Sequence, residues 1–123
     1  VHQLENIHFY GFDNPKSYYE SASIFTMTSS SEGFGIVLVE AMQYGVIPIA
    51  FNSYLSVTDI IDDGVNGLLV DAMDVDKYVE ALVSLAHDKA RRKRMGLAAI
   101  EKAKLFSIDS VVDKWEDLLF TIK

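Results

Sequence analysis

Ser30-Ser31-Glu32-Gly33-Phe34-Gly35-Ile36-Val37-Leu38-Val39-Glu40-Ala41-Met42 is the stretch that decides the fold, because it joins two glycines to an apolar segment of helical character. Positions 36 to 42 are apolar on every face of a helical wheel except at Glu40, so a helix here is expected to be buried all round. A buried carboxylate without a partner is costly. Glu40 is therefore expected either to meet a partner or to face a cleft, and a hydrated Glu at a helix edge remains the simpler alternative.

The composition describes one acidic domain. A chain of 123 residues with 50% hydrophobic content can bury one core. The net charge of -7 opposes nonspecific contact with nucleic acid, which is therefore not an expected partner. The sequence has no Cys, and no apolar run approaches the ~20 residues that span a bilayer. A cytoplasmic location is the simplest fit, and the start at Val1 suggests a piece of a longer protein.

Strand and helix patterns alternate along the chain. Strands are predicted at residues 6–10, 24–28, 46–51 and 68–70. Helices are predicted at residues 15–22, 35–44 and 58–62, then at 75–87, 88–105 and from 107 onward, with Asp74, Asp88 and Ser107 as caps. Pro48 lies inside the third strand, which indicates a strand start or an edge.

The alternation through the first 70 residues or so predicts an α/β fold, a Rossmann-like parallel sheet with helices on both faces. In such sheets ligands bind beyond the C-terminal ends of the strands, and the stretch from Ser30 starts at such an end. We expect a single domain that comprises residues 1–123.

The two glycines of this stretch suit an anion site. A glycine-rich turn from a strand into a helix lets backbone N–H groups approach a phosphate, and the helix dipole adds positive potential there. Gly33 and Gly35 fit that role, although, taken alone, two glycines here are more simply explained by a turn that needs a positive φ. Glu32 and Glu40 flank the turn, and each carboxylate can accept hydrogen bonds from vicinal hydroxyls. A ligand with phosphate groups in the middle and hydroxyl-bearing sugars at both ends would fit such a site, and a nucleotide sugar has this arrangement.

A family resemblance extends over almost the whole chain. The motif Glu32-Gly33-Phe34-Gly35 has a second glutamate, Glu40, after seven intervening residues. Together with Asn66-Gly67, Met95-Gly96 and Phe106-Ser107, it resembles the pattern of retaining glycosyltransferases. The similarity is to the nucleotide-sugar-binding C-terminal half of the GT-B fold, family 4 in particular. It implies a hexosyltransferase with a UDP- or GDP-linked sugar as the donor, no cofactor and no metal ion.

The resemblance also implies roles for individual residues. Glu32 is implied as the catalytic-site residue that contacts hydroxyls of the donor hexose, and Glu40 as the ligand of the ribose diol. The backbone amides of Phe34, Gly35 and Ile36, next to Gly33, are implied to reach the hexose and the diphosphate. By position, the resemblance places four further residues near the ribose and base: Val37, Leu38, Gly11 and Phe12.

Two departures from the family pattern stand out. The family has a Gly-Gly pair before an acidic residue in the loop after the third strand, where this chain reads Leu55-Ser56-Val57-Thr58-Asp59. In the family, the Arg and Lys that neutralise the diphosphate lie upstream of the position of residue 6. The N-terminal acceptor domain also lies upstream, and it is the expected partner in the same polypeptide. We therefore expect residues 1–123 alone to be inactive.

Other candidate sites are weaker. His2, His8 and His87 are not at metal-ligand spacing, so no metal site is expected. The basic cluster at residues 91–94 is read as a solvated helix surface, with peripheral contact at the inner face of a membrane as the alternative. The apolar stripe around Trp115 is assigned to the core, with part of it facing the other domain and therefore exposed in residues 1–123.

The function expected from the sequence is transfer of a hexose to an acceptor hydroxyl on a glycan, a lipopolysaccharide or a lipid-linked sugar, in polysaccharide biosynthesis. Two alternatives stay open: a nucleotide-sugar epimerase of GT-B fold, and a non-catalytic module that binds nucleotide sugars or serves interactions.

Overall fold

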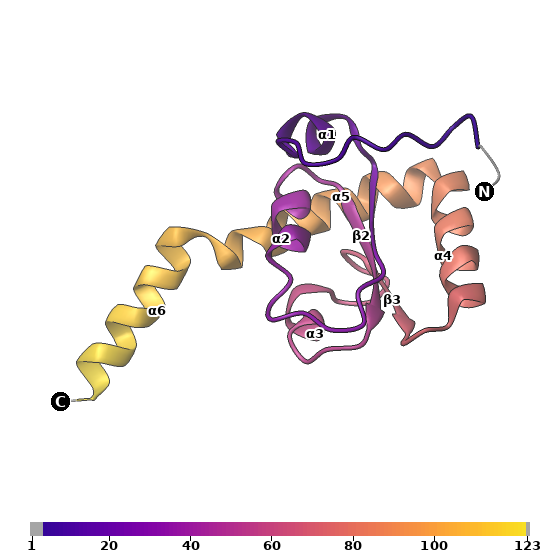
Figure 1. Ribbon diagram of the computed structural model, residues 1–123. Coiled ribbons are helices and arrows are strands. Elements are labelled where there is room, and N and C mark those ends of the chain that lie inside the picture. Colours follow the sequence, from indigo (N-terminus) through magenta and orange to yellow (C-terminus); the bar gives the residue numbers. More distant parts are fainter. Residues whose placement is uncertain (1–3, 123) are drawn as a thin grey trace.

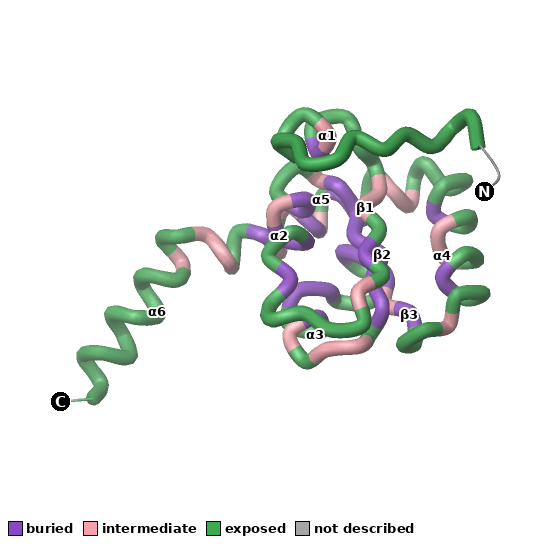
Figure 2. Tube along the Cα trace, in the orientation of Figure 1, coloured by how far each residue is buried: buried purple, intermediate pink, exposed green. Residues whose placement is uncertain are grey.

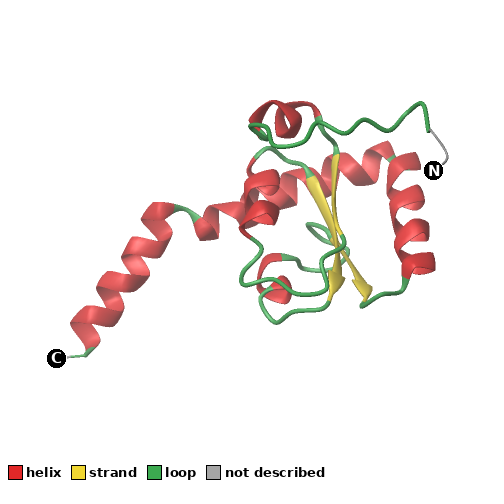
Figure 3. Cartoon of the chain, viewed as in Figure 1, coloured by secondary structure: helices red, strands yellow, loops and turns green. Residues whose placement is uncertain are grey.

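A three-stranded parallel sheet lies at the centre of the molecule. The computed structural model describes residues 4–122, and its strands are β1 (Ile24–Met27), β2 (Ile47–Asn52) and β3 (Leu68–Asp71). The strands lie together in the interior, with helices around them (Figure 3). Their order in the sheet is β1-β2-β3, with Ile24 opposite Ile47 and Ile49 opposite Leu68. The predicted parallel α/β sheet is thus confirmed.

Helices connect the strands and form the C-terminal third of the chain (Figure 1). They are α1 (Lys16–Ser21), α2 (Ile36–Gln43), α3 (Val57–Ile60), α4 (Val75–His87), α5 (Lys89–Ala103), the 3-10 turn η1 (Lys104–Phe106) and α6 (Ile108–Thr121). The side chains of Asp74, Asp88 and Ser107 each accept a hydrogen bond from a backbone N–H of the first turn, as their N-cap positions predict.

Helices cover both faces of the sheet (Figures 1 and 2). On one face, Met27 and Ala50 pack with buried side chains of α2, α3 and α5. On the other face, Ile49 and Phe51 pack with α4 and with part of α5. This alternation of neighbouring β2 residues between two cores is what a strand buried on both sides requires.

Pro48 lies near the start of the central strand. The N–H of Ile47 donates to the carbonyl of Ser23 at 3.1 Å, on the β1 side. The nitrogen of Pro48, one residue on, therefore faces the β3 side, where strand pairing begins only at Ile49. The strand-start reading of Pro48 is confirmed, and the edge reading is wrong because β2 is the middle strand.

Two glycines bring α5 close to the end of α2. Gly45 has a φ of 74° and follows the last turn of α2, where its N–H donates to the carbonyl of Met42 at 2.9 Å. A Cβ atom at Gly96 would lie 2.8 Å from the carbonyl oxygen of Gly45. The absence of a side chain at residue 96 therefore lets the two backbones touch.

The strand predicted at residues 6–10 is wrong. This segment has no strand partner and its residues are exposed. The ring of Tyr10 instead packs on Tyr18 of α1, with centroids 5.1 Å apart. Alternating aromatic residues predict a strand, but only a neighbouring strand can supply the backbone hydrogen bonds, and the described chain offers none beside this segment.

The assignment of the Trp115 stripe to the core is also wrong. Helix α6 projects from the rest of the molecule, and none of its described residues is buried (Figures 1 and 2). Trp115 is 59% exposed. The basic cluster is not wholly solvated either, since Arg92 is half-buried and its guanidinium donates to the carbonyls of Leu85 and Ala86 at the end of α4.

Candidate functional site

Helix α2 begins beyond the C-terminal end of β1, after the loop of residues 28–35. Gly35 is the N-cap and has a φ of 88° and a ψ of 41°, a left-handed conformation that glycine adopts without strain. It is buried, whereas Glu32, Gly33 and Phe34 before it are exposed. The predicted turn from strand into helix therefore exists, and its glycine is required by the backbone.

The turn presents free backbone donors. Within residues 4–122, the N–H groups of Phe34 and Gly35 donate to no protein acceptor. Helix α2 adds the unpaired N–H groups and the positive potential of its first turn at the same place. This set of donors can bind an anion without any basic side chain.

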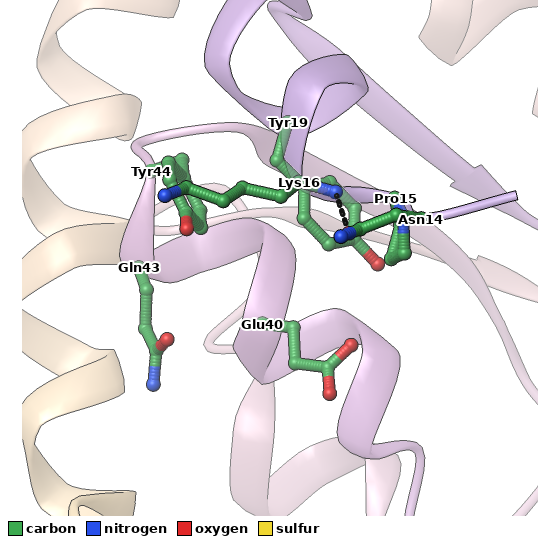
Figure 4. Close-up of a pocket in the computed structure, with 7 residues that line it drawn as sticks. All are labelled: Asn14, Pro15, Lys16, Tyr19, Glu40, Gln43 and Tyr44. Carbon is green, nitrogen blue, oxygen red and sulfur yellow. Dashed lines mark hydrogen bonds between the residues drawn. The ribbon is translucent and has the colours of Figure 1, made fainter.

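Glu40 faces a hollow of about 240 Å³ between α1 and α2 (Figure 4). The hollow is lined by Asn14, Pro15, Lys16, Tyr19, Glu40, Gln43 and Tyr44. Glu40 is half-buried. The expectation that this carboxylate faces a cleft is confirmed in its geometry.

Tyr19 forms the wall of the hollow. Its ring lies 5.9 Å from that of Tyr44 and 6.1 Å from that of Phe25, centroid to centroid. Burial, and then the negative charge of Glu40, raise the pKa of the Tyr19 hydroxyl. The hydroxyl therefore stays protonated at neutral pH. Among the described residues that line the hollow, Glu40 is the only Asp or Glu.

Glu32 lies in the exposed loop before Gly35, at the other end of the turn from Glu40. Its charge reaches Tyr54 in the loop after β2: burial first, and then Glu32, raise the pKa of the Tyr54 hydroxyl. Phe34 is 40% exposed and packs edge-on against Phe106, with ring centroids 5.6 Å apart. The two carboxylates thus flank the turn, as the sequence predicts.

The remaining predicted residues lie in different surroundings. The side chains of Ile36 and Val37 are exposed on the first turn of α2, whereas Leu38 is 0% exposed and belongs to the core. A ligand can therefore meet only the backbone of Leu38. Gly11 and Phe12 are exposed in the segment before α1, and this segment continues into Asn14 and Pro15 of the hollow.

Sequence reasoning missed most of the lining of the hollow. Gln43 and Tyr44 follow Glu40 by three and four residues, so helical spacing alone could have placed them on its face. Asn14 and Lys16 carry no such signal. They reach the hollow because α1 packs beside α2, a contact between segments distant in the sequence.

No group of three or more His, Cys, Asp or Glu side chains is arranged for a metal ion within residues 4–122. His2 lies outside the described residues, and His8 and His87 belong to no such group. Of the helices in the described part of the chain, none combines the length and the apolar character that crossing a membrane requires.

Known proteins resemble this chain in sequence and in fold. The model of the family described as glycosyl transferases group 1 matches residues 1–102. The D-inositol 3-phosphate glycosyltransferase of Kribbella flavida is 39% identical over 89 residues, which are 72% of this chain and 21% of that protein. The poly(glycerol-phosphate) alpha-glucosyltransferase of Bacillus subtilis is 26% identical over 84% of this chain and 15% of its own length.

Solved structures agree with this assignment. The C-terminal domain of a group 1 glycosyl transferase, LpcC from Francisella tularensis, has a TM-score of 0.71 at 27% identity, over 83% of this chain and 53% of that one. Anabaena HepE has a TM-score of 0.75 at 21% identity, over 85% and 29% of the two chains, and this likeness concerns the fold alone.

The chain spans about a fifth of the length of the Kribbella relative. Its fold is the one expected for the C-terminal half of a GT-B protein, and the family model covers most of its residues. By sequence and by fold, then, the chain belongs to the group 1 glycosyltransferases.

Proposed function

We propose that residues 1–123 form the donor-binding domain of a retaining hexosyltransferase that uses a nucleotide diphosphate sugar linked to UDP or GDP. One observation carries the proposal: free backbone amides at the start of α2 lie between two carboxylates, Glu32 in the loop and Glu40 in a hollow. Anabaena HepE, which shares the fold, has been solved in complex with UDP-glucose, which supports the class of donor.

Each part of the site has a role in this proposal. The amides of Phe34, Gly35 and Ile36 bind the diphosphate with the dipole of α2, and Gly33 leaves room for its approach. Glu32 accepts hydrogen bonds from hydroxyls of the hexose, and Glu40 accepts them from the ribose diol. Negative charge grows on the diphosphate as the glycosidic bond breaks, so donors aimed at it lower the barrier.

The rest of the enzyme is part of the same proposal. An acceptor domain elsewhere in the polypeptide would bind the substrate whose hydroxyl receives the hexose, and further cations for the diphosphate would come from residues upstream of residue 6. The nucleotide sugar is a substrate, and the reaction as proposed needs neither a cofactor nor a metal ion. A relative from Erwinia amylovora is named as an amylovoran biosynthesis glycosyltransferase, which favours a role in polysaccharide biosynthesis. We propose a cytoplasmic location, with the exposed Lys93 and Arg94 of α5 available for peripheral contact with a membrane.

The test is titration calorimetry of the full-length protein with UDP and with GDP. Glu40→Gln removes a charged acceptor for two hydroxyls, and hydrogen bonds to charged groups contribute about 1.5–3 kcal/mol each. We therefore expect affinity for the preferred nucleotide to fall at least about tenfold. Glu80→Gln is the matched control, because Glu80 is exposed on α4, on the opposite face of the sheet.

Unchanged affinity in Glu40→Gln would contradict the role of Glu40. A wild-type protein that binds neither nucleotide and transfers no hexose from either class of donor would overturn the proposed function itself.

A further inference from the structure

The loop after β2 is tied to the loop after β1 by side-chain hydrogen bonds. The Ser53 hydroxyl donates to the Ser29 carbonyl at 2.9 Å. The Ser56 hydroxyl lies 3.2 Å from the Gly33 carbonyl oxygen and 3.0 Å from that of Phe34, and donates to both. Figure 1 shows the two loops side by side near α3. The segment where this chain lacks the family's Gly-Gly pair thus contacts the glycine turn directly.

Ser56 makes these bonds in place of its usual one. It is the N-cap of α3, and a serine at that position normally accepts a hydrogen bond from an N–H of the first turn. Here its side chain makes no capping hydrogen bond. The start of α3 therefore goes without a side-chain cap, and the hydroxyl serves the neighbouring loop.

The two carbonyls that Ser56 holds determine where the next two amides point. The peptide bonds from Gly33 to Phe34 and from Phe34 to Gly35 are trans. In a trans peptide the N–H points away from the C=O of the same unit. With both carbonyls turned toward Ser56, the N–H groups of Phe34 and Gly35 point away from it, and both are free of protein acceptors.

Tyr54, from the same loop as Ser56, lies close to Gly35. A Cβ atom placed on Gly35 would lie 2.7 Å from the Tyr54 hydroxyl oxygen and 3.5 Å from its ring carbon Cε2. The hydroxyl is buried and has no hydrogen-bond partner in the described part of the chain. Its contribution is thus the contact of the side chain with the Gly35 backbone, at the point where α2 begins.

We infer that Ser56 and Tyr54 are positioning residues for the donor site, which hold the glycine turn so that the amides of Phe34 and Gly35 face the diphosphate. The inference rests on the proposed function, because it assigns these amides to the phosphate of a nucleotide sugar. It names two side chains that the motif around Glu32 and Glu40 does not contain.

The experiment uses the full-length protein and whichever of UDP and GDP binds the wild type more tightly. Ser56→Ala removes the hydroxyl, and Ser56→Thr retains one as the matched control. We expect Ser56→Ala to raise the dissociation constant of the nucleotide about fivefold, as measured by calorimetry. This factor corresponds to the free energy of about one hydrogen bond. Ser56→Thr should restore at least half of that loss on a logarithmic scale.

Tyr54 gives an independent pair. Tyr54→Phe removes the hydroxyl but keeps the ring, whose Cε2 atom also lies near Gly35, so it should lose less affinity than Tyr54→Ala. Tyr54→Ala removes the contact with Gly35 and should weaken binding about as much as Ser56→Ala. Because affinity is measured on folded protein, a side chain needed only for stability would lower the melting temperature and leave the dissociation constant unchanged.

A second measurement needs no nucleotide. We expect backbone ¹⁵N order parameters of Gly33, Phe34 and Gly35 to fall in Ser56→Ala and to recover in Ser56→Thr. If the order parameters fall in Ser56→Ala but the wild type binds no nucleotide, the proposed function is refuted, whereas the role of Ser56 in holding the glycine turn is supported. Unchanged affinity and unchanged order parameters in Ser56→Ala would overturn the inference.

Discussion

The hydroxyl oxygen of Tyr54 lies 2.7 Å from the position that a Cβ atom on Gly35 would take. Residue 35 therefore has two reasons to be glycine, its φ of 88° and the lack of space above its backbone. Gly33, two residues earlier, has neither, because no atom lies within 4 Å of its Cβ position and its φ is not positive.

Replacing the two glycines should thus have different effects. Gly35→Ala should lower the free energy of unfolding by about 2–4 kcal/mol, from left-handed strain and from displacement of Tyr54. Gly33→Ala should change it by less than about 0.5 kcal/mol. Urea denaturation of the two variants measures the difference, and equal losses would show that space at Gly35 is not limiting.

Tyr78 of α4 joins two strands through its buried hydroxyl. The hydroxyl oxygen accepts a hydrogen bond from the N–H of Met27 at 3.0 Å, and the O–H donates one to the carbonyl of Ile49 at 2.6 Å. Tyr78→Phe removes both of these hydrogen bonds, and we expect a loss of about 1–3 kcal/mol in the free energy of unfolding. Tyr44→Phe is the control, since Tyr44 is exposed and should show almost no loss. Equal stability of the two variants would contradict the role of the Tyr78 hydroxyl.

The same residue should make stability depend on pH in the alkaline range. Burial raises the pKa of Tyr78 above its usual value, an effect partly opposed by the hydrogen bond from Met27. A raised pKa favours the protonated form in the folded state, so this contribution is complete below about pH 10 and is lost as the pH rises through the folded pKa. Between about pH 8 and 11, the free energy of unfolding should therefore decrease more for the wild type than for Tyr78→Phe. Parallel decreases would show that other groups cause the loss.

Arg92 satisfies the last carbonyls of α4 from the next helix. One guanidinium nitrogen donates to Leu85 at 2.8 Å and also to Ala86. Arg92→Met keeps most of the side-chain length but removes both donors, and should destabilise the protein by about 1–2 kcal/mol. Arg94→Met, at an exposed position, should be neutral. Thermal unfolding of the pair is the measurement, and a neutral Arg92 variant would show that water replaces the guanidinium at no cost.

The projecting helix α6 leads to the last prediction. Trp115 is 59% exposed, so Trp115→Gln should change the unfolding free energy of the 123-residue chain by less than about 0.5 kcal/mol. Leu85→Ala, at a position with 0% exposure, should cost about 2–5 kcal/mol in the same urea experiment. A loss above about 1 kcal/mol in Trp115→Gln would show that the apolar stripe of α6 is part of the core.

Local signals in the sequence predicted the elements well where the signal lies inside the element. Asp74, Asp88 and Ser107 mark helix starts because each cap bonds to an N–H only three residues away. The strand at residues 6–10 was a wrong prediction because a strand depends on a partner that local alternation does not reveal. The exposure of α6 depends in the same way on which surfaces are present to cover it.

In the candidate site, too, the features that depend on neighbouring residues could be predicted, and those that depend on tertiary packing could not. The turn at Gly35 and the carboxylate of Glu40 are adjacent in the sequence and could be predicted from it. The hydrogen bonds of Ser56 join residues 22 and 23 positions apart, and Lys16 lines the same hollow as Glu40 only because α1 packs beside α2. Contacts of this kind follow from the packing of the fold and leave no periodic trace.

The contact between Gly45 and Gly96 has a thermodynamic consequence for the site. It fixes the C-terminal end of α2 against α5, while Ser56 and Tyr54 hold the turn at the N-terminal end. A helix held at both ends has little conformational freedom left to lose when an anion arrives. The entropic cost of ordering α2 on nucleotide binding should then be small. Any motion of α2 that accompanies binding should be shared with the rest of the domain.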